Sequence, residues 1–137
     1  MAEKVRRCDY FYVEIEDAPG QLARVLGKLR EAKVNLLAYV AFPTTPGKGQ
    51  VSVIPENASA LQNAARSAGL TLSARKECLL VQGEDKVGAA HDVLKRLADA
   101  KINLVASAAA ASGSGNFGMF IFVKPGDLSA ASRALGA

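Results

Sequence analysis

The feature of this sequence that most constrains its fold is an internal repeat. Residues 17–36 align without a gap on residues 85–104, at an offset of 68 residues, and nine of the twenty positions are identical. Self-similarity at a fixed spacing marks a structural unit that occurs more than once. We therefore expect two units in the 137 residues, the first spanning residues 1–75 and the second residues 76–137.

Hydrophobic periodicity predicts a β-α-β-β-α-β order in the first copy. Apolar residues alternate with polar ones from Phe11 to Ile15, as in a half-buried strand. Asp17 is a suitable N-cap for the helix that follows, whose apolar stripe begins at Leu22. The further elements expected are strands at 36–42 and 51–54, a helix opened by Asn57 and stopped by Gly69, and a fourth strand at 70–74.

The second copy repeats this order, with strands expected at 79–82, 104–110 and 119–123 and helices at 86–100 and 128–135. By the spacing of the first copy a fourth strand should follow, and the sequence holds none. The N-terminal stretch 4–9, or a strand of a partner chain, could fill that sheet edge. The predicted fold class is α+β, with two ferredoxin-like repeats, antiparallel sheets with helices on one face, and no last strand in the second repeat.

The repeated segment carries the same short motif in both copies. The first copy has Asp17, Pro19, Gly20 and Leu22, followed at the right distance by residues 34–36 (Val-Asn-Leu). The second copy has Asp85 and Gly88 in the same register, followed by residues 102–104 (Ile-Asn-Leu). Together these residues resemble the signature of ACT domains. The resemblance covers nearly the whole chain twice, although Val87 and Ala90 stand where the first copy has Pro19 and Leu22.

This resemblance implies a regulatory protein that binds a small effector, usually an amino acid, where two units meet. The loop after the first strand of one unit would face the second strand of its neighbour. The ligand-binding residues implied are Asp17, Ala18, Pro19, Gly20, Gln21, Leu22, Asn35 and Leu36 in the first copy, and Asp85, Lys86, Val87, Gly88, Ala89, Ala90, Asn103 and Leu104 in the second. The resemblance also implies that the protein acts either alone or in trans on a regulated enzyme or transcription regulator. We expect no cofactor.

Physical chemistry gives the same residues a ligand-binding interpretation and a purely structural one. Gly20 and Gly88 lie at helix starts, where unpaired N–H groups favour an anion such as an α-carboxylate. Asn35 and Asn103 carry amides that both donate and accept. The structural alternatives are that the two aspartates only cap helices, that the glycines only permit close helix-to-sheet packing, and that the asparagines end helices in the left-handed conformation.

Catalysis finds little support in the sequence. The single histidine, His91, aligns beside a buried stripe and is expected to be a surface residue. No cluster of Cys, His or acidic residues has metal-ligand spacing. Alternating charges at Asp92, Lys95, Arg96 and Asp99 predict a solvated helix face. We expect a protein that is not an enzyme and holds no metal.

Composition agrees with a cytoplasmic globular protein. Half the residues are hydrophobic, the net charge is +4, and no apolar run is long enough to cross a membrane or to form a signal peptide. Cys8 and Cys78 are too few for a disulfide scaffold, so reduced thiols are expected.

The likeness of residues 116–122 to an RNA-recognition strand is partial, and nucleic acid is not the expected partner. Instead, Phe120 and Phe122 are expected with Tyr10, Tyr12 and Leu80 on the open face of the sheets, covered by the sister repeat or by a second chain. This favours a homodimer. The alternative to effector binding is a ligand-free protein–protein interaction module that uses the same sheet faces.

Overall fold

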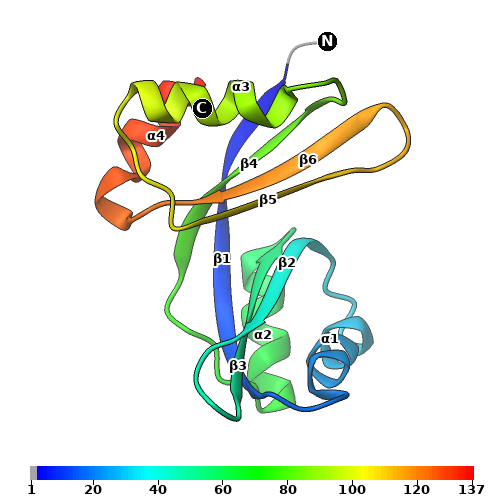
Figure 1. The fold of residues 1–137 in the computed structure, drawn as a ribbon. Helices are drawn as coiled ribbons and strands as arrows, with labels where there is room; N and C mark the ends of the chain where they lie inside the picture. Colours follow the sequence, from blue (N-terminus) through cyan, green and yellow to red (C-terminus); the bar gives the residue numbers. More distant parts are fainter. Residues whose placement is uncertain (1–2) are drawn as a thin grey trace. The chain divides into compact units, whose positions relative to one another are not determined.

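The computed structural model of the protein describes residues 3–137 and contains six strands and four helices (Figure 1). In chain order these elements are β1 (Lys4–Glu16), α1 (Gln21–Glu31), β2 (Leu36–Pro43), β3 (Lys48–Pro55), α2 (Ala58–Ala68), β4 (Lys76–Glu84), α3 (Ala89–Asp99), β5 (Ala106–Ala111), β6 (Asn116–Phe122) and α4 (Leu128–Leu135), the last preceded by a 3-10 turn at Pro125–Asp127. The strands are antiparallel and hydrogen-bonded in the order β2-β3-β1-β4-β6-β5. The predicted α+β fold with two ferredoxin-like repeats is confirmed.

The chain forms two compact units. One is Asp9–Lys76, here the first-repeat unit, and the other combines Met1–Cys8 with Glu77–Ala137, here the second-repeat unit. Strand β1 therefore belongs to both, with its N-terminal part, Lys4–Cys8, in the second-repeat unit. The division of the sequence into domains 1–75 and 76–137 stays a prediction.

The core of the first-repeat unit lies between the sheet and its two helices. Phe11 and Val13 on β1 pair with Val53 and Val51 on β3, and all four side chains are buried. They pack with the buried residues Val25 and Leu29 of α1 and Leu61 and Ala64 of α2. Because side chains alternate along a strand, the predicted period-two pattern puts these residues on the helix-covered face.

The fourth strand expected at 70–74 is absent, which corrects the prediction. Residues 70–75 have no regular secondary structure. Leu70 and Leu72 pack against the core, but only one backbone hydrogen bond joins these residues to β1, from the Ser73 N–H to the Tyr12 carbonyl (2.9 Å). The Tyr12 N–H donates instead to the Ser73 side-chain hydroxyl (3.0 Å). Short polar side chains compete in this way with the backbone for hydrogen-bonding groups, so no regular ladder forms.

In the second-repeat unit the N-terminal part of β1 takes the place of the missing strand. It is the neighbour of β4, which pairs with β6, and β6 pairs with the edge strand β5. Val5 packs against the core, whose strand residues are Leu79, Val81, Phe117, Met119 and Ile121. Two segments were expected to occupy this position, the N-terminal stretch 4–9 or a strand of a partner chain. In the structure the N-terminal stretch occupies it.

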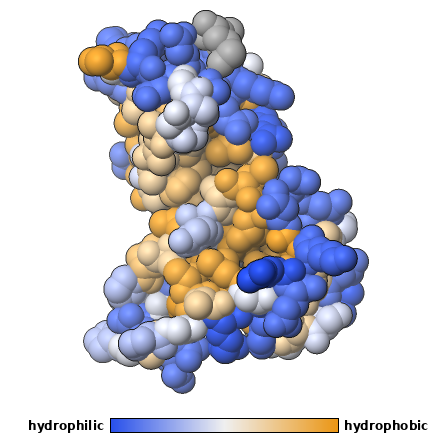
Figure 2. Space-filling model, turned by 90° about the vertical axis from the view of Figure 1, so that its right-hand side faces the viewer, coloured by the Kyte–Doolittle hydropathy of each residue, from blue (hydrophilic) through white to orange (hydrophobic). Residues whose placement is uncertain are grey.

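The residues expected on the open faces are mostly buried. Phe120 and Phe122 are 8% and 7% exposed, with ring centroids 5.0 Å apart, and Leu80 is 5% exposed. These rings are therefore not displayed for stacking on bases. The large apolar side chains that are exposed are Tyr39, Phe42, Val87 and Val105, and orange apolar atoms lie in view among the blue polar surface in Figure 2. Among residues 3–137 no helix has the length and apolarity required to span a membrane.

Candidate functional site: two equivalent loops

The two loops predicted to bind a ligand have the same backbone structure. The first loop (residues 17–22) leads into α1 and the second loop (residues 85–90) leads into α3. Gly20 and Gly88 are the N-cap residues, with φ of 86° and 82°, and neither helix start carries a side-chain cap. A residue with a Cβ is strained at such φ values, so the backbone conformation favours glycine at both positions.

Each loop is tied to the hairpin of its own repeat. The Asp17 N–H donates to the Gly47 carbonyl (3.1 Å), and the Asp85 N–H donates to the Gly115 carbonyl (2.9 Å). Gly47 and Gly115 are themselves separated by the repeat offset, and both have positive φ. The structural repeat thus continues beyond residues 17–36, into the turn between the second and third strands.

Two of the structural alternatives for these residues are wrong. Asp17 and Asp85 do not cap the helices, because each lies three residues before the glycine that is the N-cap. An ideal Cβ at Gly20 or Gly88 would meet nothing within 4 Å, so close helix-to-sheet packing does not require these glycines. The helices accordingly begin at Gln21 and Ala89, later than the sequence predicts.

Asn35 and Asn103 do not end the helices in the left-handed conformation either. That role falls to Lys33 and Lys101, with φ of 60° and 59°. The residue after each lysine donates a backbone hydrogen bond to a carbonyl in the last turn of the helix. The Val34 N–H donates to the Leu29 carbonyl (2.9 Å), and the Ile102 N–H donates to the Leu97 carbonyl (3.0 Å). This is the Schellman arrangement, and it uses a residue type that no sequence rule singles out.

Asn35 is engaged with Glu56 at the far end of α1 from the first loop. The side-chain amide of Asn35 donates to the Glu56 carboxylate (2.9 Å), and the backbone carbonyl of Asn35 accepts from the backbone N–H of Glu56 (2.9 Å). An eleven-residue helix separates Asn35 from Gly20, a length of about 16 Å. Within one unit the structure therefore does not bring the asparagine and the glycine loop together. In the second repeat, Lys124 occupies the position equivalent to Glu56.

A hollow of about 250 Å³ lies against the second loop. Its lining residues are Asp85, Lys86, Gly88, Ala89, Ala90 and His91 from the loop and the start of α3, Ala109, Ala110 and Ala111 from the end of β5, and Phe117 from β6. Five of the eight second-copy residues predicted to bind a ligand thus surround one space. Val87 is fully exposed, and Asn103 and Leu104 are not among the lining residues.

The chemistry of this hollow suits a small zwitterion. Asp85 can accept from an ammonium group, while Lys86 and the uncapped N-terminus of α3 can face a carboxylate. Ala90 lines the hollow where the first copy has the bulkier Leu22, which packs against the core of its own unit. The wall formed by Ala109, Ala110 and Ala111 was missed from the sequence, because it depends on the pairing of β5 with β6.

A second, more polar hollow of about 680 Å³ lies along α3. It shares Lys86, Ala89 and Phe117 with the first hollow and adds the charged side chains of Glu3, Glu84, Asp92, Lys95, Arg96 and Asp99. Arg96 forms an ion pair with Glu3 of the N-terminal stretch. No local sequence pattern predicts that pair, because its partners are far apart in the chain.

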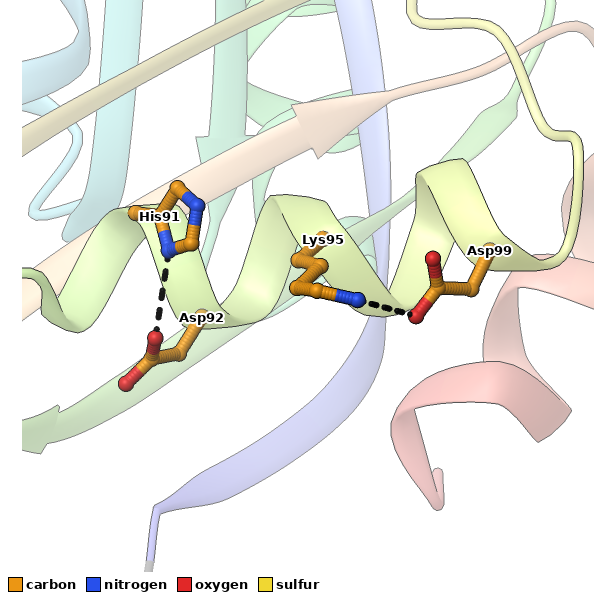
Figure 3. Close-up of polar contacts among 4 residues, drawn as sticks. All are labelled: His91, Asp92, Lys95 and Asp99. Atoms are coloured by element: carbon orange, nitrogen blue, oxygen red, sulfur yellow. Dashed lines mark hydrogen bonds and ion pairs between the residues drawn. The ribbon is translucent and has the colours of Figure 1, made fainter.

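The outward face of α3 has the expected solvated charges (Figure 3). Lys95 donates to Asp99 one turn later (2.9 Å), and His91 Nδ1 lies 3.2 Å from an oxygen of Asp92. The hydrogen bond from Lys95 to Asp99 and the charge of that carboxylate raise the pKa of Lys95 above its ordinary value. The His91 side chain is 73% exposed, as expected. Within residues 3–137 no three His, Cys, Asp or Glu side chains are grouped to hold a metal ion.

Comparison with known proteins identifies the fold. No protein-family model and no curated protein matches the sequence. Among solved structures, protein BT0572 from Bacteroides thetaiotaomicron superposes with a TM-score of 0.81 at 15% identity, covering 96% of this chain and 88% of that one. The ligand-free regulatory subunit of aspartate kinase from Thermus thermophilus superposes with a TM-score of 0.66 at 15% identity, covering 98% and 94%. The chain has the tandem ACT fold.

The regulatory subunit of aspartate kinase from Thermus flavus shares this tandem ACT fold, with a TM-score of 0.60 at 19% identity over 98% of this chain and 94% of that one. In each of these superpositions nearly the whole chain is matched, so the tandem ACT fold includes both repeats and the N-terminal strand β1.

Proposed function

We propose that this chain is a regulatory protein without catalytic activity that binds a small effector, an amino acid, at the loops that open α1 and α3. The observation that carries the proposal is the hollow beside the second loop, which gathers Asp85, Lys86 and Gly88 around one space. Pockets for drug-sized ligands are about 300–1,000 Å³, so a hollow of about 250 Å³ suits a ligand of amino-acid size.

The proposal is also supported by what the structural neighbours are. Two of them are regulatory subunits of aspartate kinase, and another structure contains the α and β subunits of an aspartokinase. By analogy we propose that this chain acts on an enzyme or regulator in trans, and that it forms a homodimer in the cytoplasm. An effector would act by stabilising one of two conformations, which the partner distinguishes.

The test is thermal denaturation of the protein with each of the twenty amino acids at millimolar concentration. A ligand at about 100 times its Kd stabilises the folded state by about 2.7 kcal/mol, which raises Tm by several degrees in a chain of this size. We expect one amino acid, or a group of similar ones, to raise Tm selectively.

Two matched variants locate the site. Gly88→Ala and Gly136→Ala both put a Cβ on a residue at positive φ with open space around it, in the same unit. Both should lower Tm of the ligand-free protein by a similar amount, because both strain the backbone. Only Gly88→Ala should also reduce the ligand-induced rise. An equal rise in both variants would place the ligand elsewhere.

A ligand-free interaction module is the second candidate. It is favoured by Tyr39 and Phe42 of β2, which are 50% and 43% exposed although they are large and apolar. The two side chains lie three residues apart and therefore on opposite faces of β2, which is an edge strand of the sheet, and an exposed apolar edge strand is a site where another chain can pair. No Tm rise with any amino acid, together with capture of a partner that Tyr39→Ser abolishes, would favour this function over the first.

A further inference from the structure

The two cysteines lie in one unit, on neighbouring strands. Cys8 is the last residue of the N-terminal segment of the second-repeat unit, and Cys78 is near the start of β4. Strands β1 and β4 are adjacent and antiparallel. Cys8 is half-buried, Cys78 is fully buried, and no disulfide joins them in the structure.

One close contact fixes the register of β1 against β4. An ideal Cβ placed on Gly83 would lie 3.1 Å from Cβ and 3.4 Å from Cα of Glu3. Cβ atoms of directly opposite residues are about 4.5–5.5 Å apart, and diagonal neighbours about 7–8 Å, so Glu3 is directly opposite Gly83. Each step forward along β1 is a step backward along β4, which places Cys8 directly opposite Cys78.

The direction of the side chains agrees with this register. Val5 on β1 and Leu79 and Val81 on β4 all pack into the same core under the helices. Side chains alternate between the two faces of a strand, so Cys8 and Cys78 both lie on the other face. On β1, Arg7 also faces the helices, since its guanidinium donates to the Ser129 hydroxyl of α4 (3.4 Å), so the alternation continues from Val5 to Arg7, the residue before Cys8.

We propose that Cys8 and Cys78 are a redox-modifiable pair that forms an intramolecular disulfide when the protein meets a hydroperoxide. Directly opposite residues of an antiparallel pair have Cα atoms about 4.5–5.5 Å apart, and disulfides span Cα separations of about 4.4–6.8 Å. The bond therefore needs side-chain rotation and little backbone movement. This inference is independent of the ligand proposed above.

The chemistry begins at the more accessible sulfur. The Cys8 thiolate attacks the peroxide, breaks its O–O bond and becomes a sulfenic acid, while the peroxide is reduced to water. The Cys78 sulfur then attacks the Cys8 sulfur and displaces the hydroxyl, which leaves as a second water with the Cys78 proton. Two thiols are oxidised and one hydroperoxide is reduced, so the electrons balance.

The bond would join β1 to β4 inside the second-repeat unit. Because it closes a loop of 69 intervening residues, it restricts the unfolded chain strongly. We expect oxidation to raise Tm, and reduction with dithiothreitol to restore the original value.

The test is treatment of the folded full chain with hydrogen peroxide at equimolar and modest excess, followed by alkylation in denaturant and mass spectrometry. The expected product is a monomer lighter by two hydrogen atoms, with the Cys8 and Cys78 peptides linked. At a fixed peroxide concentration in excess over protein, its first-order rate constant should not depend on protein concentration. The Cys8→Ser variant should give no such product, and the chain denatured in urea should give a slower, mixed one.

Several results would overturn the proposal. These are oxygen adducts on Cys8 with Cys78 left alkylatable, disulfide-linked dimers in place of the linked monomer, or an equal yield of linked peptides from the urea-denatured chain. Two cysteines that both stay alkylatable after peroxide treatment would also overturn it. Mapping the native chain does not depend on whether any variant folds, so the native chain must show either the linked monomer or one of these contrary results.

Discussion

Substituting Gly83 by alanine should destabilise the protein through one specific contact. The new Cβ would lie 3.1 Å from the Glu3 Cβ, 3.2 Å from the Phe117 ring and 3.4 Å from the Glu3 backbone. Phe117 is only 7% exposed and Glu3 is held by its ion pair with Arg96. Neither neighbour is the free end of a flexible side chain that could move aside at little cost.

The magnitude follows from the cost of overpacking. Inserting a methyl group into a well-packed site costs about 1–3 kcal/mol. In a chain of 137 residues, each kcal/mol lowers Tm by about 3–4 °C, so Gly83→Ala should lower Tm by about 3–12 °C.

Gly118→Ala is the matched control. Gly118 is also a strand glycine of the same unit, on β6, and an ideal Cβ there meets nothing within 4 Å. Removing a glycine without strain restricts the unfolded chain and stabilises by about 0.4–1 kcal/mol. Differential scanning calorimetry of the two variants should therefore show shifts of opposite sign. Equal Tm values, or a more stable Gly83→Ala, would refute the placement of Glu3 opposite Gly83 and the register derived from it.

Two further predictions concern helices. Asn57→Ala removes the cap that accepts the Ala60 N–H (3.0 Å) and should lower the free energy of unfolding, measured with urea, by about 1 kcal/mol. Asp17→Ala removes no cap and should lower it by less than about 0.5 kcal/mol. A larger loss of stability in the Asp17 variant than in the Asn57 variant would show that Asp17 does cap its helix. Lys95→Met should lower Tm slightly at neutral pH and not at all in high salt. Because Asp99 raises the pKa of Lys95 in the folded state, the stabilising contribution is present below the unfolded pKa and is lost as pH rises through the folded pKa. A deficit of the Lys95→Met variant that grew with pH in that range would contradict this account.

Local patterns predicted the parts of the fold that local interactions determine. The repeat and its turn residues located Gly20 and Gly88 correctly, because a positive φ strongly selects glycine. Asn57 and Gly69 were correctly predicted as the limits of α2, since caps act within a single turn. The strand expected at 70–74 was wrong, because a single hydroxyl, that of Ser73, competes for the partner strand's N–H.

Features that depend on pairing between distant segments could not be predicted in this way. The partner of Asn35 is Glu56 because β2 and β3 pair in one particular register. The alanine wall of the hollow faces the second loop because β5 is the edge strand beside β6. Both depend on sheet geometry, which the sequence pattern of a single strand does not contain.

Strand β1, which belongs to both units, has a consequence for how this protein can be divided. A fragment that starts at Lys76 would contain every helix of the second-repeat unit but not Lys4–Cys8. Its strand β4, with the run Cys-Leu-Leu-Val at residues 78–81, would then have an unprotected edge open to other chains. Cutting the chain between the sequence repeats would therefore yield one fragment prone to aggregate, although a fragment of residues 9–76 would retain its own core.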